Sequence, residues 1–127
     1  DYQPLSPDEA TVAWLRAAGV RRVVCGHLPH GDAPLVLRAA EGIDVVTADI
    51  GYADEVRWHG EAAAKPDQAA CEVLLGPGPE DAVVHGVLSN GLAFEAELGD
   101  ALMGRTLEGG WRVKGRAGGM LVLSRND

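Results

Sequence analysis

The chain has 127 residues, of which 46% are hydrophobic and 24% are charged, and its formal net charge is -8. These proportions are typical of a globular domain, or of part of one, and exclude a disordered chain. Because nucleic acids and anionic membranes bind basic surfaces, the negative charge argues against both as partners. No apolar run approaches the ~20 residues that a membrane-spanning helix needs.

The amino-terminal segment predicts a helix followed by a strand. Ser6 can cap a helix, the proline after it suits the first helical position, and Glu9 completes a Ser-x-x-Glu capping box. Apolar residues then recur at helical spacing until Gly19, which favours a helix end. The apolar run over 20–25 that follows directly is typical of a strand.

The next segment predicts a crossover and a second strand. Pro34 can open a short helical turn through Ala40, closed by Gly42. The β-branched run over 43–48 predicts a strand, which ends in a second polar loop. Helix, strand, loop, crossover and strand in this order are typical of α/β architecture. Residues 53–68 show no sustained periodicity, and we expect a long loop there.

From residue 69 onward the pattern changes to short strands separated by turn residues. Asn90-Gly91 is a hairpin signal, because this pair tolerates the positive φ angles of a tight turn. We therefore expect α/β passing into antiparallel β, with a meander over 69–127 packed on a core over 1–68. The expected strands are 70–75, 83–88, 92–97, 111–116 and 120–125.

Alternation along these strands predicts which side chains are buried. Phe94, Trp111 and Val113 fit one buried face, whereas Arg112 and Lys114 fit the solvent face.

The two cysteines, Cys25 and Cys71, lie far apart in predicted strands. Two thiols do not make a disulfide framework, so we expect both to be reduced core residues of a cytoplasmic protein. A cysteine within a strand is also more typically inert than nucleophilic.

The loop after the first strand, Gly26-His27-Leu28-Pro29-His30-Gly31-Asp32, carries the densest chemistry. In an α/β sheet the carboxyl end of a strand is where ligands and metals are usually held. His27 and His30 are open to three interpretations: metal ligands, a phosphate-contacting pair, or structural histidines. Imidazole nitrogen suits Mn, Fe and Zn, and Asp32 and Asp49 offer carboxylates. Because a two-metal hydrolytic site needs about four to six ligands, these residues make part of such a site.

Residues 20–54 resemble the carboxyl-terminal part of calcineurin-like metallophosphoesterases. The segments Val23-Val24-Cys25-Gly26-His27-Leu28-Pro29 and Val45-Val46-Thr47-Ala48-Asp49-Ile50-Gly51 carry the resemblance. They are similar to that family's final Gly-His motif at a strand end and to the Asp-containing turn one strand later. Proline two residues after the histidine is similar to the branch with serine/threonine-type phosphatases and dinucleotide tetraphosphatases.

The resemblance implies that His27 binds one metal of a dinuclear pair of Mn, Fe or Zn. We further expect His30 to contact the phosphate, and Gly26, Asp32 and Asp49 to support the site. The implied reaction is hydrolysis of a phosphoester, with a phosphorylated small molecule or a phosphoprotein as the substrate.

The resemblance further implies a partial α/β sandwich of the metallophosphoesterase type with its amino-terminal half absent. The family's Asp-x-His, its Gly-Asp followed by an Asp-Arg-like segment, and its Asn-His do not occur in these 127 residues. We therefore expect a carboxyl-terminal fragment that is inactive alone and packs against a missing half. The alternative is a non-catalytic α+β module, a degenerate relative that binds a protein or a small ligand.

Overall fold

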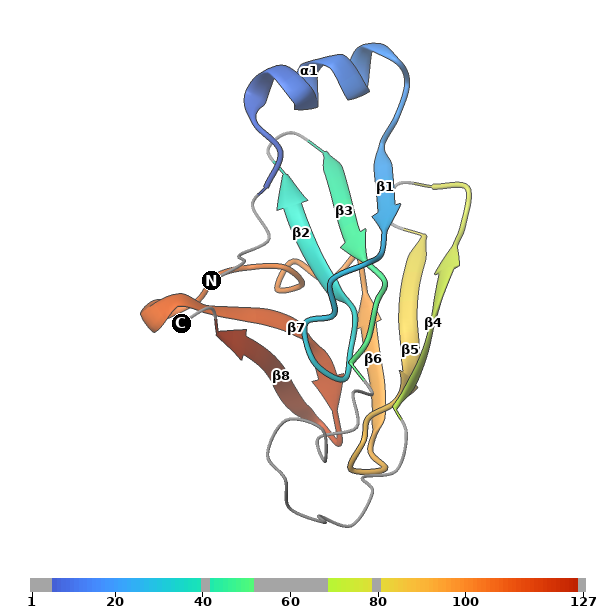
Figure 1. The fold of residues 1–127 in the computed structure, drawn as a ribbon, viewed down its shortest axis with the longest axis vertical. Helices are drawn as coiled ribbons and strands as arrows, with labels where there is room; N and C mark the ends of the chain where they lie inside the picture. The colour runs from blue at the N-terminus through green and yellow to red at the C-terminus, as the bar shows by residue number, and fades with distance from the viewer. Residues whose placement is uncertain (1–5, 40–41, 52–68, 79–80, 126–127) are drawn as a thin grey trace.

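The computed structural model describes residues 6–39, 42–51, 69–78 and 81–125, and strands dominate these ranges (Figure 1). The elements in chain order are α1 (Glu9–Ala17), β1 (Arg22–Cys25), β2 (Leu35–Ala39), β3 (Ile43–Thr47), β4 (Ala70–Leu75), β5 (Ala82–Val87), β6 (Ala93–Glu97), the 3-10 turn η1 (Glu108–Gly110), β7 (Trp111–Ala117) and β8 (Met120–Arg125). All five strands expected from residue 70 onward are confirmed, to within one residue at each end.

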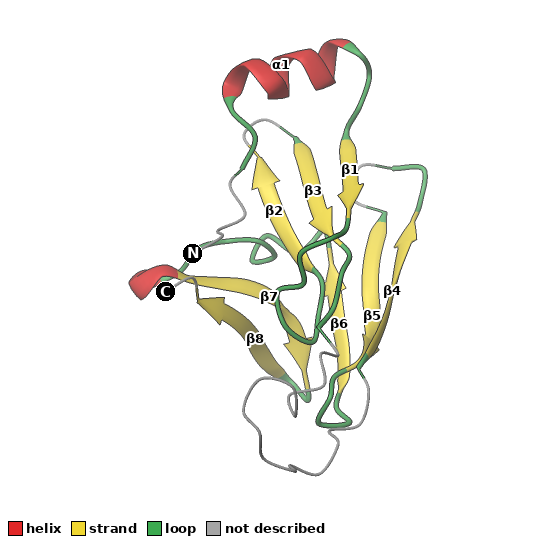
Figure 2. Cartoon of the chain, in the orientation of Figure 1, coloured by secondary structure: helices red, strands yellow, loops and turns green. Residues whose placement is uncertain are grey.

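The described strands form two sheets (Figure 2). The smaller sheet has the order β1-β3-β2, with β1 parallel and β2 antiparallel to β3. The larger sheet has the order β4-β5-β6-β7-β8 and is antiparallel throughout. This is the meander that the turn signals predict, because each strand pairs with the next one along the chain.

The helix α1 begins two residues later than the capping box predicts. Asp8, not Ser6, is the N-cap, and its Oδ1 accepts the backbone N–H of Thr11 at 2.7 Å. A carboxylate at this position satisfies a free helix N–H and faces the positive end of the helix dipole. Gly19 follows the helix with φ 74°, as a glycine stop requires. Figure 1 shows α1 across one end of the three-stranded sheet.

The predicted helical turn from Pro34 is wrong, because residues 35–39 form the strand β2. This strand pairs with β3 from Leu35↔Thr47 to Ala39↔Ile43. Val36 joins the core between the sheets, while Leu35 and Leu37 are buried on the opposite face. Pairing and burial on both faces therefore outweigh the weak helix-start signal of a single proline. The expected α/β part is correspondingly a mixed sheet with one helix in the described ranges.

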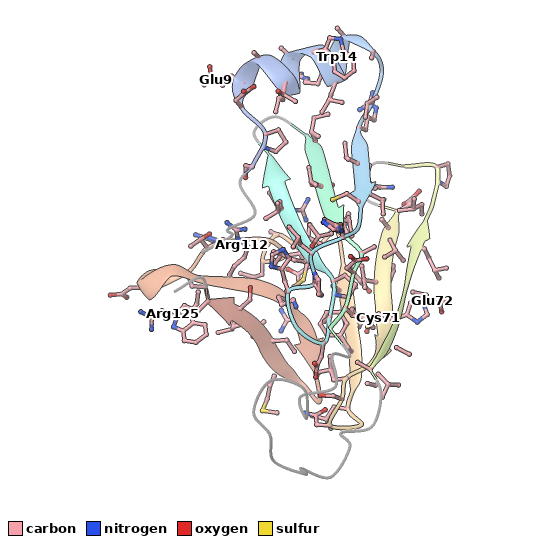
Figure 3. All side chains as sticks on the ribbon, in the orientation of Figure 1. Glu9, Trp14, Cys71, Glu72, Arg112 and Arg125 are labelled. Carbon is pink, nitrogen blue, oxygen red and sulfur yellow. The ribbon has the colours of Figure 1, made fainter. Side chains whose placement is uncertain are left out.

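One hydrophobic core lies between the two sheets. The smaller sheet contributes Val36 and Val46, and the larger contributes Val84, Phe94 and Val113, all of them at most 2% exposed. Side chains fill this space (Figure 3). The amino- and carboxyl-terminal regions thus bury their apolar faces against each other, which is the main source of stability for such a layered fold.

Arg38 of β2 joins the sheets by polar contacts. Its Nε donates to the Met103 carbonyl at 3.0 Å, and its Nη2 donates to the Leu98 carbonyl. Its Nη1 lies 3.3 Å from the Asp44 carboxylate on β3. Because both backbone acceptors belong to the loop after β6, Arg38 fixes that loop against the smaller sheet.

Trp111 is not a core residue, contrary to the alternation argument. It is 39% exposed, and the Arg125 guanidinium lies 5.5 Å from the centre of its ring. Trp111 begins β7 and pairs with Arg125 at the end of β8, so it lies at the sheet margin. The ring is covered by a cation there and not by the opposite sheet.

Cys25 is also exposed and not in the core, because it ends β1 at the edge of the three-stranded sheet. Cys71 is half-buried and packs against the core. Both thiols are free of disulfide bonds. The loop expected over 53–68 lies outside the described residues. Over the described ranges, no helix has the length and apolar character required to cross a membrane.

Candidate functional site

The parallel pair β1–β3 brings two loops to one edge of the sheet. Cys25 and Thr47, the last residues of these strands, lie opposite each other. The backbone then continues the ladder, because the Ala48 N–H donates to the Cys25 carbonyl at 2.7 Å. The carboxyl ends of parallel strands are where ligands are usually held, so both predicted polar loops meet at one candidate site.

Asp49 braces the loop that carries the histidines. Its Oδ2 accepts the backbone N–H of His27. The Gly51 N–H donates to the Gly31 carbonyl at 2.8 Å and ties the same two loops a second time. A Cβ atom on Gly26 would lie 2.7 Å from Asp49 Oδ1, so a larger residue there would displace this carboxylate from its present position. Gly26 and Asp49 thus lie beside the His27 backbone at the end of β1.

His27 has an unusual backbone conformation. Among the residues that the structure describes, it is the one non-glycine residue with positive φ, at 99°. This region is costly for a residue with a Cβ atom, and such residues are concentrated at functional sites. The residue is exposed, so its imidazole is open to a ligand. A glycine would adopt this backbone conformation without that cost.

His30 is half-buried in the same loop. Burial, together with the positive charges of Lys114 and Arg112, lowers the pKa of its imidazole. His30 is therefore neutral at pH 7, with one ring N–H as donor and one ring nitrogen as acceptor. Such a side chain can contact a phosphate by a hydrogen bond but not as a cation.

The Asp32 side chain is bonded to the larger sheet and not to His27 or Asp49. Its Oδ2 accepts from the Ser89 hydroxyl and, at 3.2 Å, from the Ser89 N–H. Ser89 lies in the turn between β5 and β6, so Asp32 anchors the loop to that hairpin. The structure thus brings Gly26, His27 and Asp49 together and places Asp32 in a structural contact.

Cys71 lies behind the loop, with its Sγ 3.8 Å from the Asp32 carbonyl. Burial raises the pKa of this thiol, and the nearby Asp32 charge acts in the same direction. Cys71 is therefore protonated at neutral pH and does not serve as a nucleophile.

Lys114 is the residue that strand alternation misses. It was expected on the solvent face but is 3% exposed, and its Nζ donates to the His30 carbonyl at 2.6 Å. The register of β7 shifts between Val113 and Gly115, so Lys114 is the extra residue of a bulge. A glycine inside a strand pattern is a bulge signal, and Gly115 is that signal in the sequence.

Arg112, also expected on the solvent face, is half-buried. Its Nη1 is buried and has no hydrogen-bond partner within the described ranges. Arg112 and Lys114 are two cations from β7 whose charges act on His30. Two cations of the larger sheet therefore lie close to this end of the loop, which also carries the Asp32 carboxylate.

The described residues fit one metal-ligand position and not a complete metal site. The exposed imidazole of His27 is a suitable donor for Mn, Fe or Zn. The nearby Asp49 carboxylate accepts the His27 N–H and braces the loop. Over the described ranges, no three His, Cys, Asp or Glu side chains gather around one point. A dinuclear centre needs about four to six ligands, so most would come from elsewhere.

Comparisons of the chain with protein-family models, with curated proteins and with solved structures found no match.

Proposed function

We propose that this chain is the carboxyl-terminal part of a metal-dependent phosphoesterase and that His27 is one of its metal ligands. The observation that carries the proposal is the positive φ of His27, with its N–H held by Asp49 at the carboxyl end of a parallel strand pair. Backbone strain is tolerated where the side chain is needed in one orientation. The Gly-His sequence and the Asp-containing turn of this site resemble those of calcineurin-like metallophosphoesterases.

Each residue of the loop has a role in this proposal. His27 binds one metal of a Mn, Fe or Zn pair, and neutral His30 donates a hydrogen bond to a phosphate oxygen of the substrate. Asp49 and Gly26 hold the His27 backbone, and Asp32 anchors the far end of the loop. A bound metal pair supplies a nucleophilic hydroxide and neutralises phosphate charge. The remaining ligands are expected from a metallophosphoesterase-type amino-terminal half that packs on the three-stranded sheet.

The substrate class in this proposal is a phosphorylated small molecule or a phosphoprotein. The cations Arg112 and Lys114 beside His30 support an anionic substrate at this end of the loop. We place the reaction in the cytoplasm, because the chain has two free thiols and no disulfide framework.

The test uses the natural polypeptide that contains this chain. We expect it to hydrolyse p-nitrophenyl phosphate in the presence of Mn²⁺, and we expect His27→Ala to lower metal affinity by more than about 100-fold, because even residues that only support a ligand contribute about 10- to 100-fold. His85→Ala is the matched control, since His85 lies on β5 beside Glu72, outside the loop. Unchanged Mn²⁺ affinity and unchanged hydrolysis in His27→Ala would remove His27 from the metal site.

The second candidate function is a non-catalytic binding module. An open hollow of about 800 Å³ on the outer face of the larger sheet favours it. Its lining combines apolar Leu74 and Val87 with the polar side chains of His85, Glu95 and Arg116, which suits a small ligand with an apolar body and polar groups. The p-nitrophenyl phosphate assay distinguishes the two functions. If the natural polypeptide is a binding module, it shows no Mn²⁺-dependent hydrolysis.

A further inference from the structure

The bulge in β7 is the one interruption of register in the larger sheet over the described ranges. Val113 pairs with Leu123, and Gly115 pairs with Val122, the residue just before Leu123. Lys114 therefore has no pairing partner on β8. As a result, the consecutive residues Val113 and Lys114 are both buried, at 0% and 3% exposure. Bulges re-aim side chains and are frequent beside active sites. Here the bulge turns a lysine from the solvent face into the protein.

Lys114 ends against the histidine loop. Its Nζ donates to the His30 carbonyl at 2.6 Å and lies 3.9 Å from where a Cβ on Gly31 would stand. The carboxylate of Asp32 is the nearby negative charge that favours the charged form of Lys114 and so opposes the effect of burial. Asp32 is itself anchored to Ser89. The loop is thus held from the larger sheet at two of its residues, His30 and Asp32.

Stability alone is a poor reason for a lysine at this position. Burying an ammonium group is costly, and replacing buried charges by well-packed apolar residues is often neutral or stabilising. A methionine in the same bulge would fill similar space without a charge. What methionine cannot supply is a donor to the His30 carbonyl and a positive charge beneath the loop.

We propose that Lys114 is a positioning residue for the phosphate-binding end of the site: its Nζ holds the His30 carbonyl, so that the loop presents His30 to a phosphate. This inference rests on the proposed function, because it gives the loop a phosphate ligand. Lys114 is too buried to touch that ligand and acts through His30. The neighbouring Arg112, half-buried and on the same strand, adds a second charge of the same sign.

The test compares Lys114→Met, Lys114→Arg and the control Arg16→Met in the natural polypeptide that contains this chain. Arg16 is an exposed cation in the last turn of α1, outside both the histidine loop and β7. The first measurement is amide hydrogen exchange at Gly51, whose N–H is bonded to Gly31 and reports on the loop. We expect about tenfold faster exchange in Lys114→Met, and wild-type exchange in Arg16→Met.

The second measurement is a titration with inorganic phosphate, followed by the imidazole signals of His30 in an NMR spectrum. We expect Lys114→Met to bind phosphate about tenfold more weakly than wild type. Lys114→Arg keeps a donor and the charge, and we expect it to recover most of the affinity. If Lys114 were only structural, folded Lys114→Met and folded Lys114→Arg would bind phosphate with the same affinity.

Wild-type phosphate affinity and wild-type Gly51 exchange in folded Lys114→Met would overturn the inference. If methionine prevents folding, Lys114→Gln keeps an N–H donor without the charge. Glutamine should then weaken phosphate binding by about threefold, and wild-type affinity would overturn the inference equally. A wild-type chain that binds no phosphate counts against the proposed function instead, and Gly51 exchange alone then decides whether Lys114 holds the loop.

Discussion

The two sheets differ in how they are built and in what they offer a ligand. The larger sheet is a meander in which each strand pairs with its neighbour in the chain, so its loops alternate between the two ends. The smaller sheet places β1 and β3 in parallel and therefore gathers two loops at one edge. His27, Asp49 and the Gly31–Gly51 contact all lie at that edge.

The strand topology of the two sheets determines where side chains from different loops can converge. A regular antiparallel sheet supplies stability and a flat scaffold, whereas a parallel pair supplies a point of convergence. The larger sheet contributes to the candidate site where its own regularity fails, at the Lys114 bulge. We therefore expect substitutions in the shared core to unfold the protein, and substitutions in the loops to disturb the candidate site.

The largest expected effect is on the shared core. Phe94 is 2% exposed and packs in the cluster that both sheets form. We expect Phe94→Ala to lower the free energy of unfolding by about 3–5 kcal/mol, because a large buried ring is lost and a cavity remains. Urea denaturation measures this change. Leu92→Ala, at a residue 38% exposed, is the control and should cost far less. Equal effects would mean that the sheets do not share this core.

The next effect concerns the pH dependence of stability at the bulge. Burial lowers the pKa of Lys114 from 10.5 to about 8. Between these values the unfolded chain holds a proton that the folded chain has released, so the free energy of unfolding rises with pH. The full rise is on the order of 3 kcal/mol. The measurement is the free energy of unfolding between pH 7 and 10.5 for wild type and for Lys114→Met. The difference between the two curves should show this rise.

Subtracting the Lys114→Met curve cancels the other groups that titrate in this range, such as Cys71, whose pKa is raised by burial. Parallel curves for the two proteins would show that Lys114 titrates normally and is not buried at a bulge.

A smaller effect is expected where the two loops meet. Asp49→Ala removes the carboxylate that accepts the His27 N–H. We expect a loss of about 1 kcal/mol, because this contact is partly exposed to water. Asp49→Asn keeps an acceptor oxygen and should lose less. Thermal or urea unfolding of both variants measures the difference, and an asparagine variant as unstable as the alanine one would argue against the hydrogen bond.

The smallest effect has the opposite sign. His27→Gly removes the cost of positive φ, and we expect it to stabilise the chain by roughly 0.5–1 kcal/mol while removing the proposed metal ligand. His27→Ala is the matched control, because alanine retains the Cβ atom and therefore the strain. A glycine variant no more stable than the alanine variant would show that His27 does not carry this strain.

The sequence predicts the larger sheet well and the smaller sheet in part. Strands 70–75 and 120–125 agree with β4 and β8 to the residue, because turn residues on both sides are strong local signals. Residues 35–39 fail for the opposite reason. Their pattern is short and apolar, and only pairing with β3 decides that it is a strand. The helix end at Gly19 is confirmed, while the cap moves from Ser6 to Asp8.

For the candidate site, the residue types and their position directly after strands can be predicted from local sequence patterns. His27 and Asp49 could be predicted as neighbours, because the ends of parallel strands share an edge. The positive φ of His27 and the burial of Lys114 were decided by tertiary structure alone. Alternation is a local rule, and a bulge resets it through pairing with another strand. Local patterns determine the strands, but contacts between distant residues, such as Lys114 and His30, determine the site.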